Sequence, residues 1–152
     1  MSKSIQQWLD AYGESHQNPT NKLVHWVCVP SILFSIIGLL YAIPFPVEKT
    51  MFLNWAAVAF ALALVFYLRL SFSMFLGFVV IAVLMLWAWH SLAAVGIGAL
   101  WALGIFVVAW IGQFWGHQVE GKKPSFLQDV QFLLIGPAWL LHFVYRRMGI
   151  PF

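Results

Sequence analysis

The feature that most constrains this chain of 152 residues is a series of four long apolar runs separated by short links. An α-helix rises about 1.5 Å per residue, so about 20 apolar residues can cross a hydrocarbon core of roughly 30 Å. We therefore predict four membrane-spanning helices, over residues 23–43, 51–68, 72–89 and 92–115. The links at 69–71 and 90–91 are so short that the helices on either side must be antiparallel neighbours.

The composition excludes a water-soluble domain. Hydrophobic residues make up 62% of the chain and charged residues only 9%, against about 25% charged residues in soluble domains. A single domain of this size cannot bury so much apolar surface, so we expect one integral membrane domain over residues 1–152, embedded in a lipid bilayer. The eight Lys and Arg residues are too few and too scattered for a nucleic-acid partner. A single cysteine, Cys28, excludes an internal disulfide and a cysteine-based metal site.

The first twenty residues predict an interfacial lead rather than a span. Ile5, Trp8, Leu9 and Tyr12 recur at helical spacing, which predicts a short amphipathic helix that ends near Gly13. An Asn-Pro pair at 18–19 then predicts a turn, because the residue before proline avoids helical angles. The segment lacks a long apolar stretch, so we expect no cleavable signal peptide.

A fifth apolar stretch, residues 126–145, has polar residues near its start and a Gly136-Pro137 pair in its middle. If only the four earlier runs cross the membrane, seven of the eight Lys and Arg residues lie on the same side of the membrane as both termini. Positive residues collect on the cytoplasmic side of membranes, so this arrangement is favoured and places both termini in the cytoplasm. The predicted fold is therefore an all-α, multi-pass helical bundle of four spans, with a broken re-entrant or interfacial fifth segment and an N-terminal amphipathic helix.

Histidines dominate the polar residues near the predicted helix ends. In this topology His16, His25 and His117 lie at one membrane face, and the Asn-Pro turn allows His16 to fold back over His25. Glu120 follows His117 by three positions and shares its helical face. His142 returns to this face only if the fifth segment is re-entrant, whereas a fifth histidine, at position 90, belongs to the opposite side.

Converging imidazoles with a carboxylate can bind a divalent metal such as zinc, iron or manganese. The absence of thiolate ligands argues against structural zinc, and imidazole with carboxylate and open positions is typical of non-haem iron oxygenases.

Most of these residues also have plainer interpretations. A histidine at an interface can serve only as an amphipathic anchor, and Asn18 and Asn21 can simply form the turn and cap the first span. Lys122 and Lys123 are typical positive-inside residues that could also meet a substrate carboxylate. Asp129 can cap the last helix or support a ligand histidine.

Two separated motifs resemble the membrane 2-hydroxy fatty acid dioxygenase family over nearly the whole chain. The first is Tyr12-x3-His16-x-Asn18-Pro19-x-Asn21-x3-His25-x4-Pro30, and the second is Trp110-x2-Gln113-Phe114-x-Gly116-His117-x2-Glu120-x3-Pro124. The best-described members are fungal, lie in the endoplasmic reticulum, and shorten 2-hydroxypalmitate by one carbon with ferrous iron and molecular oxygen.

The resemblance implies a fatty-acid α-oxidation enzyme in which Fe2+ and O2 cleave a 2-hydroxy fatty acid between C1 and C2. It implies His16, His25 and His117 as iron ligands and Glu120 as a further catalytic candidate, while His142 is a weaker one. Tyr12, Asn18 and Asn21 would then surround the ligands. A 2-hydroxy carboxylate can chelate iron, and a site near the headgroups suits a fatty acid's carboxylate. The expected membrane is a bacterial inner membrane or, in a eukaryote, the endoplasmic reticulum.

Two other classes of protein fit the same residues. One is a non-enzymatic lipid-binding scaffold or small transporter whose histidines only stabilise helix ends. The other is a haem protein with paired histidine ligands between helices. Iron without a Soret band, a Soret band, or neither would distinguish the three.

Overall fold

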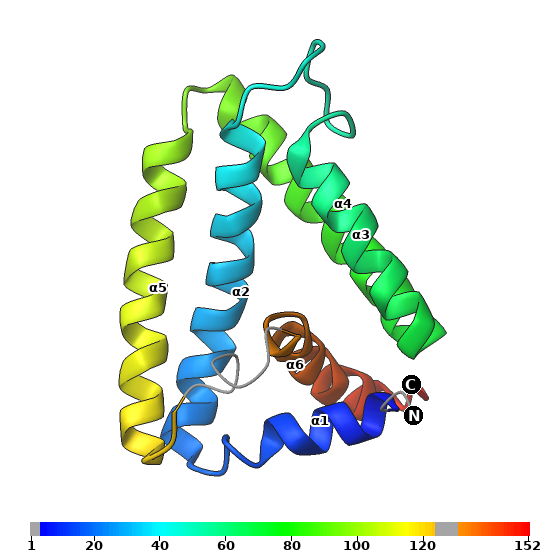
Figure 1. The fold of residues 1–152 in the computed structure, drawn as a ribbon, viewed down its shortest axis with the longest axis vertical. Coiled ribbons are helices and arrows are strands. Elements are labelled where there is room, and N and C mark those ends of the chain that lie inside the picture. The colour runs from blue at the N-terminus through cyan, green and yellow to red at the C-terminus, as the bar shows by residue number, and fades with distance from the viewer. Residues whose placement is uncertain (1–3, 124–130) are drawn as a thin grey trace. The chain divides into compact units, whose positions relative to one another are not determined.

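The computed structural model describes residues 4–123 and 131–152, and within them it is all-α, as predicted (Figure 1). The described residues form six helices and no strand: α1 (Ile5–Gly13), α2 (Pro19–Ala42), α3 (Trp55–Leu70), α4 (Phe72–Ala94), α5 (Ala99–Glu120) and α6 (Phe132–Met148). Three of them, α2, α4 and α5, are long and apolar enough to cross a membrane. The predicted second span coincides with α3, which is apolar but has only 16 residues.

The largest difference between the helix boundaries and the predicted runs lies between the third and fourth runs, because α4 ends at Ala94 and α5 begins only at Ala99. Residues 90–91, the expected link, lie inside α4, which continues to Ala94. The helix ends where Gly96 adopts a positive φ of 83°, a backbone conformation that glycine reaches without a steric cost. Apolar character continues across this turn, which is why hydropathy alone did not reveal the boundary.

The Gly136-Pro137 pair does not break the last helix, contrary to the prediction. Proline 137 is the sixth residue of α6, and the helix continues through it to Met148. Proline removes one backbone donor and crowds the preceding turn, but the loss comes near the helix start, and five of the eight residues that α6 buries come after the glycine-proline pair. Residues 126–130 of the predicted segment, with Asp129, lie outside the described part of the chain.

The chain divides into two compact units, of which the first comprises residues 1–30 and 108–152. The helix predicted in the N-terminal lead is α1, and its buried side chains are the four predicted ones: Ile5, Trp8, Leu9 and Tyr12. In this unit α1 packs against α6 (Figure 1). There the Trp8 and Phe132 rings meet edge to face with centroids 5.5 Å apart.

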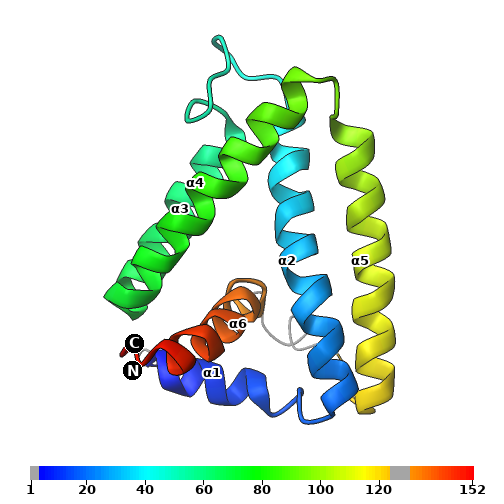
Figure 2. The ribbon, with the colours of Figure 1, turned by 180° about the vertical axis from the view of Figure 1, so that it is seen from behind.

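The other pair in this unit is the N-terminal part of α2 beside the C-terminal part of α5, running antiparallel in both views (Figures 1 and 2). Small residues permit the close approach that the Gly112-x3-Gly116 spacing indicates. A Cβ atom on Gly112 would lie 2.7 Å from Cys28 Sγ, and one on Gly116 would lie 2.6 Å from Asn21 Oδ1. These two glycines therefore set the distance between the two helices.

The second unit comprises residues 31–107 and contains α3 and α4 side by side (Figure 2). Ser71 both ends α3 and caps α4, since its hydroxyl accepts a bond from the backbone N–H of Met74. Trp89 anchors the core of this unit: it is 1% exposed, and its indole N–H donates to the Phe34 carbonyl at 2.8 Å.

Candidate metal site

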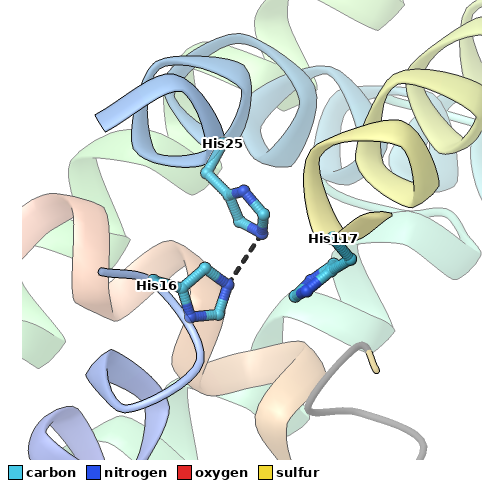
Figure 3. Close-up of side chains that lie close together, drawn as sticks. All are labelled: His16, His25 and His117. Atoms are coloured by element: carbon cyan, nitrogen blue, oxygen red, sulfur yellow. Dashed lines mark hydrogen bonds between the residues drawn. The ribbon is translucent and has the colours of Figure 1, made fainter. Parts of the chain in front are cut away.

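Three of the predicted histidines come together in the first unit (Figure 3). His16 lies between α1 and α2, His25 lies in the second turn of α2, and His117 lies in the last turn of α5. All three are buried, and one ligand-capable nitrogen from each lies within 4.8 Å of the others. The structure thus gathers imidazoles from segments about 100 residues apart, as the sequence predicted.

Backbone carbonyls fix the tautomers of two of these rings. Nδ1 of His16 lies 2.6 Å from the carbonyl oxygen of Tyr12, and Nδ1 of His25 lies 2.9 Å from that of Asn21. A carbonyl oxygen only accepts hydrogen bonds, so each Nδ1 must carry the proton. In the neutral rings both Nε2 atoms are therefore bare, that is unprotonated, and the one on His25 also accepts a hydrogen bond from the Gln113 amide at 2.6 Å.

The two bare nitrogens face each other. Nε2 of His16 and Nε2 of His25 are 2.8 Å apart, and two lone pairs at this distance repel unless a proton or a cation lies between them. Burial lowers the pKa of His16 to about 4, so protonation of that ring is disfavoured at neutral pH. A metal cation satisfies both lone pairs, and the Nδ1 bonds to carbonyls are the support that metal-binding histidines usually have.

The third ring, that of His117, brings a further nitrogen to the same cluster. His117 is 3% exposed, and its Nδ1 is buried with no hydrogen-bond partner among the described residues. A buried polar atom without a partner costs free energy, so such atoms usually indicate a ligand, water or ion. Three neutral imidazoles that each offer a ring nitrogen fit a divalent metal, and the absence of thiolates among them favours iron, manganese or catalytic zinc over structural zinc.

Glu120 does not join this cluster, although its carboxylate suits a metal. Its two oxygens accept hydrogen bonds from the backbone N–H groups of Gln17 and Asn18, at 2.8 and 2.9 Å, and from Asn21 Nδ2 at 3.0 Å. The carboxylate, at the end of α5, therefore fixes the turn that follows His16. Its place in the structure is that of a positioning residue.

The two asparagines shape the turn and the start of α2. Asn18 precedes the helix and its Oδ1 accepts from the Thr20 N–H at 2.9 Å, while Pro19 occupies the first helical position, where its missing donor costs nothing. Asn21 is fully buried, and its Nδ2 also contacts the Ser15 carbonyl at 3.3 Å. Tyr12 stacks on the His16 ring with centroids 4.2 Å apart. Tyr12 and Asn21 therefore contact the histidines directly, whereas Asn18 shapes the turn between His16 and His25.

The remaining candidates lie outside the cluster. Lys122 and Lys123 are exposed, and Lys122 Nζ donates to the Glu14 carbonyl at 2.6 Å. His142 is buried against the Phe143 and Phe152 rings, and its Nδ1 contacts the carbonyl of Trp139. The histidine at position 90 belongs to the other unit, where its Nδ1 lies 2.8 Å from Tyr41 Oη.

The sequence motifs contain Gln113 but assign it no role, and the structure places it beside the cluster. It is 5% exposed, and its amide nitrogen lies 2.6 Å from Nε2 of His25. Its amide oxygen is buried without a partner among the described residues. The signal in the sequence is an amide inside an apolar run, four residues before His117 and so on the same helical face.

Comparisons with known proteins identify the family of this chain. A family model described as "2-hydroxy-palmitic acid dioxygenase Mpo1-like" matches residues 2–148. The 2-hydroxy-palmitic acid dioxygenase MPO1 of Saccharomyces cerevisiae is 29% identical over 149 residues, covering 95% of this chain and 82% of the yeast protein. No solved structure matches significantly. Because the family model spans both histidine-bearing segments and everything between them, the chain belongs to the Mpo1-like family that the two sequence motifs indicated.

Proposed function

We propose that this protein is an iron-dependent dioxygenase that cleaves 2-hydroxy fatty acids between C1 and C2. The observation that carries the proposal is the pair of bare Nε2 atoms 2.8 Å apart, each on a ring whose Nδ1 is bound to a carbonyl. The dioxygenase named in yeast supports the substrate class, because its similarity extends over 95% of the chain.

In this proposal His16, His25 and His117 hold the metal ion. Ferrous iron with open coordination positions supplies redox chemistry with oxygen and a Lewis acid for the hydroxyl and carboxylate of the substrate. The protein contributes neutral, oriented imidazoles, because the carbonyls of Tyr12 and Asn21 hold the Nδ1 protons. Burial of all three rings limits the access of water to the reacting groups.

The position of the site suits an amphiphilic substrate. His117 is in the last turn of a helix that is long enough to span a membrane, and His25 is near the start of another. Groups at the ends of spanning helices lie near the lipid headgroups, where the carboxylate of a fatty acid also resides. The acyl chain can then remain among apolar side chains while C1 and C2 reach the histidines.

The geometry argues against the two alternatives. In a haem protein, two axial histidines flank the macrocycle, but the His16 and His25 rings contact each other directly, with centroids 4.2 Å apart. A purely structural pair of histidines would not place two unprotonated nitrogens face to face, because their lone pairs repel each other at 2.8 Å.

Metal analysis of detergent-purified protein tests the site. We expect near-stoichiometric iron without a Soret band, and loss of iron in His25→Ala and His117→Ala. A matched control is His90→Ala, because that imidazole is exposed and hydrogen-bonds to Tyr41 in the other unit. Full iron retention in both site variants would refute the assignment.

Product analysis tests the reaction. Anaerobically iron-loaded protein is mixed with 2-hydroxypalmitate and oxygen, and the fatty acids are then identified by mass spectrometry. We expect a fatty acid one carbon shorter, formed by the His90→Ala control and not by His25→Ala. Unchanged substrate with fully iron-loaded protein would refute the proposed activity.

A further inference from the structure

We propose that Gln113 is a specificity-determining residue, whose amide recognises the 2-hydroxy carboxylate head of the substrate and so selects hydroxylated over plain fatty acids. This inference rests on the proposed function and assigns one part of its substrate recognition. Three observations carry it: the burial of the amide, its contact with His25, and its unpaired oxygen.

The amide is placed where a purely structural residue would not be expected. Gln113 lies within α5, a helix apolar enough to span a membrane, and is 5% exposed. A buried polar group in such a segment is costly unless it is satisfied, so it is a candidate for function. Yet its Oε1 has no hydrogen-bond partner in the described part of the chain, and its Nε2 contacts a histidine nitrogen that a metal would use.

Metal binding would free both ends of this amide. Nε2 of His25 is an acceptor because its Nδ1 holds the ring proton against the Asn21 carbonyl. When a cation takes that lone pair, the N–H of Gln113 loses its acceptor, while Oε1 still lacks a donor. The side chain then offers one donor and one acceptor, both buried beside the metal ligands.

The head of a 2-hydroxy acid has the complementary pair. Its hydroxyl can donate to Oε1, and its carboxylate can accept from the Nε2 protons. A plain fatty acid has the carboxylate but no hydroxyl donor, so it would leave the amide oxygen buried and unpaired. Sites that hydrogen-bond a substrate hydroxyl discriminate strongly against analogues that lack it, for this reason.

The position along α5 agrees with this role. Gln113 precedes His117 by four residues, which places it about 6 Å farther from the helix end. In a spanning helix this is the direction of the membrane interior, from which the acyl chain of a lipid substrate would approach. The amide therefore lies on the side of the histidine cluster where C2 and the chain would enter.

The test compares binding of two ligands to the metal-loaded protein without oxygen. Full-length protein is loaded with Co2+ as a spectroscopic probe, and 2-hydroxypalmitate and palmitate are titrated while the visible absorption is followed. We expect wild type to bind the hydroxylated acid at least about 10-fold more tightly, and Gln113→Leu to reduce that ratio by about 10-fold or more with unchanged Co2+ content. Gln118→Leu, an exposed neighbour on the same helix, is the matched control and should keep the ratio.

A second variant guards against misfolding. Gln113→Asn keeps the amide but withdraws it by one methylene from the proposed position of the substrate head, so it should also lose selectivity. An unchanged ratio in either variant that retains Co2+ would overturn the inference. So would loss of Co2+ from both variants, because Gln113 would then support the metal and not the substrate.

The binding ratio also separates this inference from the proposed function. Wild-type protein that prefers the hydroxylated acid but does not cleave it would refute the reaction and leave the role of Gln113 intact. Protein that cleaves 2-hydroxypalmitate but binds both acids equally would refute the role of Gln113 alone.

Discussion

Replacing Gly116 by alanine should disrupt the metal site without touching a metal ligand. A Cβ atom at this position would lie 2.6 Å from Asn21 Oδ1 and 3.1 Å from Val24 Cγ1. Ordinary contact begins at 3.4 Å, so α2 and α5 would have to separate by about 0.8 Å. Asn21 cannot relieve the clash easily, because it is fully buried and tied to Ser15 and Glu120.

The expected magnitude follows from the tolerance of metal sites. Ligand distances hold within about 0.2 Å, so a shift of about 0.8 Å between His117 and His25 is several times too large. We expect Gly116→Ala to weaken metal binding by about 10- to 100-fold, the range seen when the groups that orient metal ligands are disturbed. Overpacking should also destabilise the fold by about 1–3 kcal/mol, partly offset by the better helix propensity of alanine.

Two other glycines on α5 provide graded controls. Gly104 faces open space, so Gly104→Ala should leave metal binding unchanged. Gly112→Ala should be intermediate, because the obstructing atom is the terminal sulfur of Cys28, 2.7 Å from where the new Cβ would lie, and that side chain can rotate. Iron content and affinity are measured on detergent-purified proteins with thermal unfolding beside them. Equal iron affinity in the alanine variants of Gly104 and Gly116 would refute the close-approach argument.

The remaining predictions concern the residues around the cluster. Glu120→Gln should destabilise the protein by about 1–2 kcal/mol and lower its iron content, because the carboxylate holds Gln17, Asn18 and Asn21 together; an unchanged thermal midpoint and iron content would contradict this. Chelation of the metal should lower the thermal midpoint of wild type, because bound metal stabilises the folded state by about 2.7 kcal/mol at a concentration 100-fold above its dissociation constant. An equal shift of the midpoint in His25→Ala would show that metal at this site is not the cause. His142→Phe should keep its full iron content by metal analysis, since His142 lies outside the cluster. Loss of iron from this variant would indicate that His142 is a ligand after all.

Much of the fold could be predicted because its signals are local. The spacing of Ile5, Trp8, Leu9 and Tyr12 indicated both the extent of α1 and the side it buries. The end of α4 was misplaced because apolar residues continue across Val95–Gly98, and only the positive φ of Gly96 marks the turn. Hydropathy indicates which segments are apolar, but it does not indicate where a helix ends within an apolar segment.

The gathering of the three histidines could be predicted from the sequence, whereas the residues that support them were harder to predict. Histidines are rare in apolar segments, so their positions alone indicated a cluster, which the structure forms. Glu120 has the chemistry of a ligand, but three donors on the turn take its oxygens. Gln113 stands out in the sequence only as an amide in an apolar run, and its contact with His25 depends on the packing of α5 on α2. Residue type shows what a side chain can do, and tertiary contacts decide which of those roles it takes.

The small residues between α2 and α5 explain why a metal would matter to the fold as well as to catalysis. In lipid, helices gain little from burying apolar surface, so their association depends on close packing and on polar contacts. Gly112 and Gly116 supply the packing, and Glu120 supplies hydrogen bonds to the turn before α2. Without a cation, the facing nitrogens of His16 and His25 repel each other beside the turn that Glu120 holds. A cation shared with His117 would remove that repulsion and would join His25 on α2 to His117 on α5, so the ion proposed to serve the chemistry would also hold the two helices together.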